Sequence, residues 1–257
     1  MRYYFTLWVE SLLLNIKTRL QYRADFVLSI IVSLLSYCLN FLFFLLVFRY
    51  ISSAGGMDWN HMLVLIGTAQ FVMSVYAFLN GNAQDKIFEH VLKGSWDRVR
   101  ARPVPEMFYV LFGNPDCGNI IAIAYAVALI IIGMCRTGIE ISRLPFYMIG
   151  CAIALLSYTT LSMFMCAITF YFVRVPAFAA LLSSFSSYAT LPKAMYKGCL
   201  LVLFVYFLPV AVWGNMPAEI LFDGQVWWRG MAGIVVSLLI SFAILKNALA
   251  SYESAGG

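Results

Sequence analysis

Long stretches without a charged side chain are the feature that most limits what this chain can fold into. Residues 26–48, 59–84, 117–135, 144–173 and 198–218 contain no Asp, Glu, Lys or Arg. About 20 apolar residues in a helix cross the roughly 30 Å of a bilayer core, where only helices or closed barrels satisfy the backbone. With 63% hydrophobic and 11% charged residues in 257, the chain also lacks the polar surface of a soluble domain. These properties predict an all-α integral membrane protein.

A sixth apolar stretch begins near Gln225. It carries Arg229 close to its start, beside Trp227 and Trp228, which is typical of a helix entering a bilayer. We therefore predict one transmembrane domain over residues 1–257 with six transmembrane helices. Their predicted ranges are 26–48, 60–81, 117–135, 147–172, 197–214 and 226–246.

The distribution of basic residues predicts the orientation of these helices. The chain has 17 Lys+Arg against 12 Asp+Glu, a formal net charge of +5. With six spans and a cytoplasmic N-terminus, 13 of the basic residues face the cytoplasm and four face outward. Cytoplasmic loops of membrane proteins carry such an excess, so the charge predicts topology and no nucleic-acid partner. Both termini are expected to be cytoplasmic.

Residues 175–192 (VPAFAALLSSFSSYATLP) are uncharged but rich in serine and bounded by proline. If they crossed the membrane, the basic residues would divide into 11 inside and six outside, a weaker bias. We therefore predict a cytoplasmic interfacial helix here, with a seventh crossing as the alternative.

The first 24 residues form a separate predicted element. Apolar side chains recur at helical spacing, which favours an amphipathic helix along the inner leaflet over a polar extension of the first span. The stripe consists of Phe5, Trp8, Val9, Leu12, Leu13, Ile16 and Leu20.

The sequence shows no pattern for catalysis. His61 and His90 lack metal-ligand spacing, the six cysteines form no CxxC pair, and neither a GxSxG elbow nor a GxxxxGK[ST] phosphate loop occurs. We therefore expect no catalytic residue and no metal site. Asp116, in the break that precedes the third span, is interpreted as part of a turn, with a broken-helix ion site as the alternative.

Residues 85–106 form the longest charged stretch, on the predicted cytoplasmic side. Four apolar residues give a short helix one hydrophobic face, Gly94 can end that helix, and Pro103 and Pro105 prevent it from continuing. The helical face consists of Ile87, Phe88, Val91 and Leu92. The stretch predicts a rigid amphipathic knob, although an ordinary positively charged loop has the same composition.

Prolines punctuate the region around the fifth predicted span. Pro209 lies inside this span and predicts a kink, and residues 215–224 form a short outer segment that can dip back into the membrane.

These two regions resemble the permease subunits of ABC-2 type ATP-binding-cassette exporters, specifically a poorly characterised six-span ABC-2 family. That family carries a G-x-x-D…R-P pattern after the second span and a P…Y…P…P pattern around the fifth. The matching residues here are Gly94, Asp97, Arg102 and Pro103, followed by Pro192, Tyr196, Pro209 and Pro217. The layout of helices resembles the family over nearly the whole chain, although the stretch DRVRARP (97–103) has more arginine than the family pattern.

The resemblance implies a coupling helix within 85–106 that contacts a separate ATPase subunit, and an extracellular gate between spans five and six. The implied ATPase contacts are Lys93, Gly94, Trp96, Asp97, Arg102 and Pro103, and the implied gate residues are Pro217, Glu219 and Phe222. It also implies ATP and magnesium on the partner ATPase, no cofactor in this chain, and an identical or sister six-span permease. The expected location is the cytoplasmic membrane of a bacterium, in contact with lipid.

The glycine and I-x-L-P pattern of ABC importers is absent from the sequence, which favours export. The apolar, aromatic spans suggest a hydrophobic or amphipathic cargo such as a lipid, peptide or drug-like molecule. Two alternatives remain at this point. The chain could be an ATP-independent channel or scramblase, or an intramembrane enzyme with a scattered site.

Overall fold

The computed structural model describes residues 2–81, 83–171, 184–224 and 228–250, and within these ranges the chain is helical apart from short connections and one isolated bridge between Ala54 and Met57. The main α-helices are α1 (Arg2–Gln21), α2 (Arg23–Tyr50), α3 (Trp59–Asn80), α4 (Ala83–Leu92), α5 (Asp97–Arg100), α6 (Glu106–Phe112), α7 (Ile120–Thr137), α8 (Leu144–Tyr171), α10 (Cys199–Val202), α11 (Val210–Asp223) and α12 (Trp228–Ala250). Short helical turns are η1 (Cys117–Asn119), η2 (Ile141–Arg143) and η3 (Lys193–Met195), and η4 (Leu203–Phe207) is π-helical.

Four helical segments of the described chain are long and apolar enough to cross a membrane. They are Arg23–Tyr50, Trp59–Asn80, Glu106–Thr137 and Ile141–Ile168, and a bent pair formed by Cys199–Val205 and Val210–Asp223 would make five if it were one span. A shorter apolar helix covers Ile234–Ala250. The multi-pass, all-helical architecture expected from the uncharged runs is therefore present.

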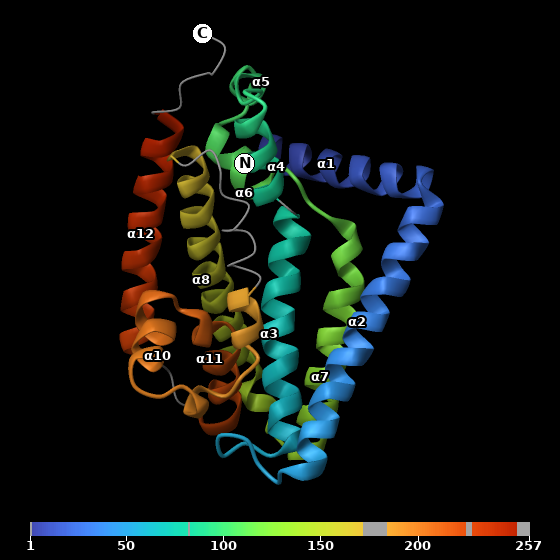
Figure 1. Cartoon of the computed structure of the whole chain (residues 1–257), viewed down its shortest axis with the longest axis vertical. Helices are drawn as coiled ribbons and strands as arrows, with labels where there is room; N and C mark the ends of the chain where they lie inside the picture. The colour runs from blue at the N-terminus through green and yellow to red at the C-terminus, as the bar shows by residue number, and fades with distance from the viewer. Residues whose placement is uncertain (1, 82, 172–183, 225–227, 251–257) are drawn as a thin grey trace.

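The long helices run along the molecule, whereas α1 lies across one end of it (Figure 1). That end also carries α4, α5 and α6, and we call it the α4 end. The opposite end carries the α2–α3 connection, residues 51–58, and we call it the α2–α3 end. The helix over 2–21 matches the predicted N-terminal element, and its attachment to a membrane surface stays a prediction.

Two helices form the interior of the bundle. The half of α3 from Met62 to Ala69 is buried, and in α11 every residue from Val210 to Ala218 is buried as well. A helix that is apolar all round is stable when other helices surround it, and α11 lies against α3 and α8. By contrast, α2 has a single buried residue, Phe44, and its apolar side chains point outward.

The predicted fifth span, 197–214, is sharply bent in the structure. The axes of the two halves of the bent pair differ by 79°, and Pro209, which has no N–H for a helical hydrogen bond, separates π-helical η4 from α11. The segment that leads into the pair passes residue 55, where a Cβ on Gly55 would lie 3.0 Å from the Pro192 Cβ.

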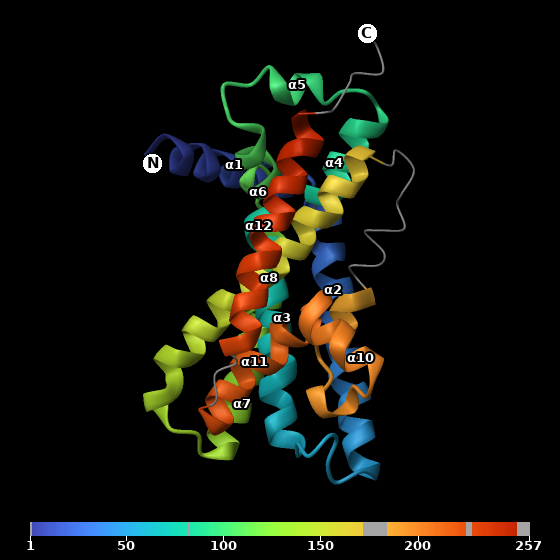
Figure 2. The same cartoon turned by 90° about the vertical axis from the view of Figure 1, so that its left-hand side faces the viewer.

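The other end of the pair lies at the same end of the bundle. Near the end of α11, the ring of Phe222 lies 4.6 Å from that of His61 at the start of α3, and Arg143 donates a hydrogen bond of 3.2 Å to the carbonyl of Leu221. The contacts on both sides of the pair therefore lie at the α2–α3 end, and we interpret the segment as a re-entrant hairpin (Figure 2).

The predicted side for residues 175–192 conflicts with a contact next to this range. The predicted topology puts residues 175–192, which end next to Lys193, on the cytoplasmic side and Glu219 in the outer segment. However, the Lys193 Nζ and a Glu219 carboxylate oxygen are 2.9 Å apart. Residues 184–192 therefore lead to the α2–α3 end, away from α4. The rest of this range, 175–183, and positions 172 and 226–227 of the predicted spans lie outside the described residues.

This arrangement makes a direct prediction for topology. In a variant without native cysteines, Ser53→Cys and Lys197→Cys should react with a membrane-impermeant maleimide from one side of the bilayer, and Lys93→Cys from the other. All three side chains belong to exposed residues. Labelling of positions 93 and 197 from the same side would contradict the hairpin and restore the predicted span.

Candidate functional site

The candidate site is the surface at the α4 end formed by residues 85–106. Helix α4 ends where Gly94 adopts a φ of +59°, a left-handed conformation that favours glycine. The Gly94 N–H donates to the Val91 carbonyl at 3.2 Å, and the Ser95 N–H donates to the His90 carbonyl at 2.8 Å. The turn directs the chain into Trp96 and the single helical turn of α5. The predicted knob is thus a helix, a glycine turn and a second short helix.

The buried half of this knob is apolar. Trp96 is fully buried, with its ring 4.9 Å from that of Phe170 in α8 and 6.2 Å from that of Tyr109 in α6. One continuous cluster joins it to α4, α8 and α12, and its buried members are Ile87, Val91, Trp96, Val99, Tyr109, Val110, Met163, Cys166, Ala167, Leu245, Ala248 and Leu249. The knob is therefore anchored on the ends of α8 and α12.

This burial corrects one predicted contact residue. Trp96 was implied as an ATPase contact, but its side chain is inaccessible from outside and serves as the anchor of the knob. Its position between two turns did not reveal this, because tryptophan occurs both in cores and at interfaces.

The other implied contact residues form the outer surface of the knob. Lys93, Asp97, Arg102 and Pro103 are exposed, and Gly94 is partly exposed. Lys93 makes only an exposed contact of 3.5 Å with Glu89. The Arg102 guanidinium lies 5.0 Å from the centre of the Tyr109 ring, a cation–π distance that holds the charge close to the knob. The structure thus leaves these five residues accessible on the surface of the knob.

The electrostatics of this face are positive. Partial burial, followed by the nearby cation Arg102, lowers the pKa of His90, so its imidazole is neutral at pH 7 and adds no charge. The His90 Nδ1 and the Ser95 Oγ are 2.9 Å apart, which makes the histidine part of the turn, as its place in a loop helix suggested. The positive charge comes from lysine and arginine.

Sequence reasoning did not identify Arg100 as a residue that fastens the knob. Arg100 donates from Nε to a Glu106 carboxylate oxygen at 3.0 Å, and its guanidinium also donates to the backbone carbonyl of Leu249 near the end of α12. These contacts join positions 149 residues apart in sequence. No short-range pattern could show that an arginine in α5 meets a helix end at the far end of the chain.

A second polar connection ties α1 to the bundle. The Arg19 guanidinium pairs with the Asp116 carboxylate, and the Asn15 side-chain oxygen accepts a hydrogen bond of 3.2 Å from the Cys117 N–H. Asp116 also accepts from the Gly118 N–H at 2.9 Å. Asp116 therefore caps a turn, as interpreted from sequence. No group of three or more His, Cys, Asp or Glu residues within the described ranges could hold a metal ion.

The implied gate residues lie in α11. Pro217 is buried. It packs closely on α8, because a Cβ on Gly150 would lie 3.2 Å from the Pro217 Cα. Glu219 forms an ion pair with Lys193. The Asn215 side chain accepts from the Lys193 N–H at 2.7 Å and donates to the Leu191 carbonyl at 3.0 Å. The three residues are thus part of the re-entrant hairpin, whose second half contains the predicted segment 215–224.

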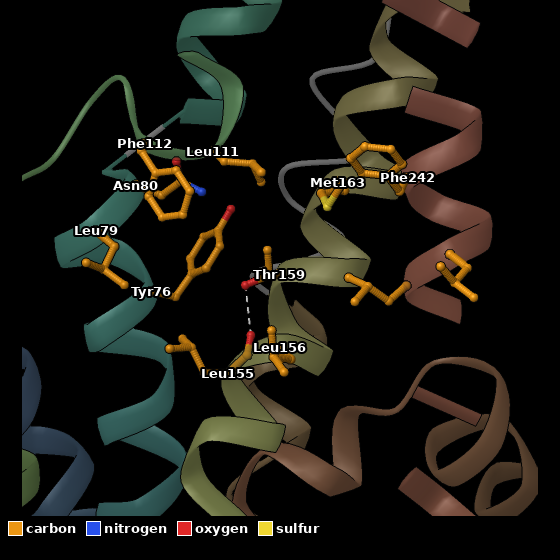
Figure 3. A pocket seen from close by; sticks show the side chains of 12 residues that line it. Tyr76, Leu79, Asn80, Leu111, Phe112, Leu155, Leu156, Thr159, Met163 and Phe242 are labelled. Carbon is orange, nitrogen blue, oxygen red and sulfur yellow. Dashed lines mark hydrogen bonds between the residues drawn. The ribbon is translucent and has the colours of Figure 1, made fainter. Parts of the chain in front are cut away.

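A cavity of about 520 Å³ lies between α3, α6, α8 and α12 (Figure 3). Its walls are almost entirely apolar, and the polar side chains that line it are those of Tyr76, Asn80 and Thr159. The uncharged spans gave no indication of its position, because cavity walls and helix contacts use the same apolar residues.

The anchoring role of Trp96 can be tested by truncation. Trp96→Ala should lower the stability of the purified protein by about 3 to 5 kcal/mol, the usual cost of removing a buried tryptophan side chain, seen as a clear fall in Tm. Asp97→Ala, at the next and exposed position, should leave the Tm nearly unchanged. Equal effects of the two substitutions would show that Trp96 does not anchor the knob.

Comparison with known proteins identifies the family of the chain. Neither the curated proteins nor the solved structures gave a match. The family model described as "ABC-2 family transporter protein" matches residues 34–256, a range that includes the knob and the re-entrant hairpin. The chain therefore belongs to the ABC-2 family of transporter proteins.

Proposed function

We propose that this chain is the permease subunit of an ATP-driven ABC exporter, with ATP and magnesium bound and hydrolysed by a separate ATPase subunit. The observation that carries the proposal is the division of the 85–106 knob into two halves. Its apolar half is buried on the transmembrane helices, and its charged half is exposed at one end of the molecule. A partner protein could bind the polar outer side of the knob, and because the inner side is rigidly anchored, movement of that partner would also move the helices.

The anchoring contacts suggest how movement would be transmitted. Trp96 packs on Phe170 of α8, and Arg100 is bonded to the Leu249 carbonyl of α12. A displacement of the knob would therefore also displace α8 and α12. An ATPase can shift the conformation of the permease only by binding one conformation more tightly than the other. The knob is the element on which that difference would act.

The exposed surface of α2 supports a second permease subunit. Large apolar residues point outward on several faces of α2, and only part of such a surface need face lipid. We assign part of it to an identical or sister permease chain, so that two permeases enclose a pathway. The re-entrant hairpin, with Pro217, Glu219 and Phe222, would close that pathway on the outer side.

The remaining features of the proposal follow from this arrangement. The α4 end would face the cytoplasm of a bacterium and the α2–α3 end would face outward. The absence of an importer pattern in the sequence favours export, and the apolar interior favours a hydrophobic or amphipathic cargo.

The ATPase contact can be tested by charge reversal. Lys93→Glu combined with Arg102→Glu should reduce the amount of ATPase subunit that co-purifies with the permease by about tenfold or more, because two cations on the contact surface become anions. The Tm of the isolated permease should stay unchanged, since both residues are exposed.

Arg136→Glu is the matched control. Arg136 is also exposed, near the end of α7 at the α2–α3 end, where no ATPase contact is proposed, and its reversal should leave co-purification intact. An unaffected complex in the double variant, or an equal loss in the Arg136 variant, would refute the assigned contact surface.

A further inference from the structure

The cavity between α3, α6, α8 and α12 contains a polar atom that the fold leaves unsatisfied. Asn80 is 3% exposed, and its Oδ1 has no hydrogen-bond partner in the part of the chain that the structure describes. A buried acceptor without a donor costs free energy, and such atoms are rare in folded proteins. Asn80 thus marks a place where a donor from another molecule would be stabilised.

The other polar groups of the cavity have partners. Thr159 donates to the Leu155 carbonyl at 2.8 Å. The Tyr76 hydroxyl is hydrogen-bonded to the Ser162 hydroxyl and also interacts with the Asn80 side chain, whose Oδ1 is still left without a partner. Figure 3 shows the Asn80 side chain beside Tyr76 and Phe112. The cavity therefore offers one open acceptor at one end of an apolar chamber.

We propose that this cavity binds a neutral, single-chain amphiphile taken from the bilayer, with its hydrocarbon chain between α3, α8 and α12 and a hydroxyl of its head donating a hydrogen bond to the Asn80 Oδ1. No charged side chain lines the cavity, and burying an unpaired charge there would be costly. The ligand is therefore neutral.

The mouth of the cavity opens toward the lipid-facing surface. Leu156, Leu239 and Phe242 line it and are 49%, 64% and 45% exposed. Asn80 is the last residue of α3, at the α4 end, so the polar head would lie near one membrane surface and the chain would extend toward the bilayer centre. This orientation matches that of a lipid in the adjacent leaflet.

The cavity is also connected to the knob. Leu111 and Phe112 of its wall belong to α6, which directly follows the knob, and Met163 lines the cavity while packing in the same cluster as Trp96. The site deepens the proposed transport function, on which its role as a place of cargo entry rests. Binding itself requires no ATPase.

The test uses native mass spectrometry of the full-length permease, titrated with two probes. 1-Monoolein has an oleoyl chain and two free hydroxyls, whereas methyl oleate has the same acyl chain and no hydrogen-bond donor. We expect 1-monoolein to bind about tenfold more tightly. Equal affinities, or no binding of either probe, would overturn the proposal.

Two substitutions distinguish the contribution of the ligand's hydrocarbon chain to binding from that of its polar head. Asn80→Leu should abolish the preference for 1-monoolein while both probes still bind. Leu239→Trp should narrow the mouth of the cavity and lower the affinity for both probes at least fivefold. Its matched control is Val236→Trp, on the same helix and also exposed but outside the cavity wall, which should bind like wild type.

These results are independent of the ATPase experiment. If the preference for 1-monoolein is found but no ATPase co-purifies, the lipid site stands and the transport proposal fails. If the ATPase co-purifies and Leu239→Trp binds both probes like wild type, the transport proposal stands and the site is refuted.

Discussion

Close approach of helix backbones through glycine is the constraint on which the rest of the structure depends. A Cβ on Gly133 of α7 would lie 2.6 Å from the Val64 Cγ2 of α3, and a Cβ on Gly67 of α3 would lie 3.0 Å from the Ala126 carbonyl oxygen. Between membrane helices, lipid removes most of the hydrophobic driving force, so dispersion contacts at short distance hold the pair together. The α3–α7 pair is therefore the frame of the bundle.

The re-entrant hairpin depends on the same principle. A Cβ on Gly214 would lie 2.6 Å from the Ala189 carbonyl oxygen and 2.9 Å from the Ala69 Cβ. Only a residue without a side chain lets α11 fit between α3 and the segment that precedes η3. The helix is then covered by protein, which matters because the chain breaks its helical hydrogen bonding near Pro209. Such breaks are tolerated at membrane depth where other protein segments surround them.

The sequence was sufficient for the helical class, for the five long helices and for the exposed charges of the knob, because each depends on local composition or helical period. It was insufficient for the re-entrant hairpin. An apolar stretch of 197–214 has the length of a span, and its hydrophobicity is the same whether it crosses the bilayer or turns back. The distinction rests on Lys193 meeting Glu219 and on Phe222 meeting His61, which are contacts between segments and leave no periodic pattern.

In the knob, too, features that depend on neighbouring residues could be predicted from the sequence, whereas roles that depend on distant contacts could not. Gly94 and the prolines marked its turns, and Lys93 and Arg102 proved exposed as their charge required. Trp96 and Arg100 differ because their roles are set by Phe170 of α8 and Leu249 of α12, which lie 74 (170 − 96) and 149 residues further along the chain. These two residues fasten a charged surface to helices that also wall the Asn80 cavity. A force applied at the α4 end would consequently reach the cavity through packed side chains and the hydrogen bond from the Arg100 side chain to the Leu249 carbonyl. A rigid anchor is required for this, because a flexible loop would absorb the displacement before any helix moved.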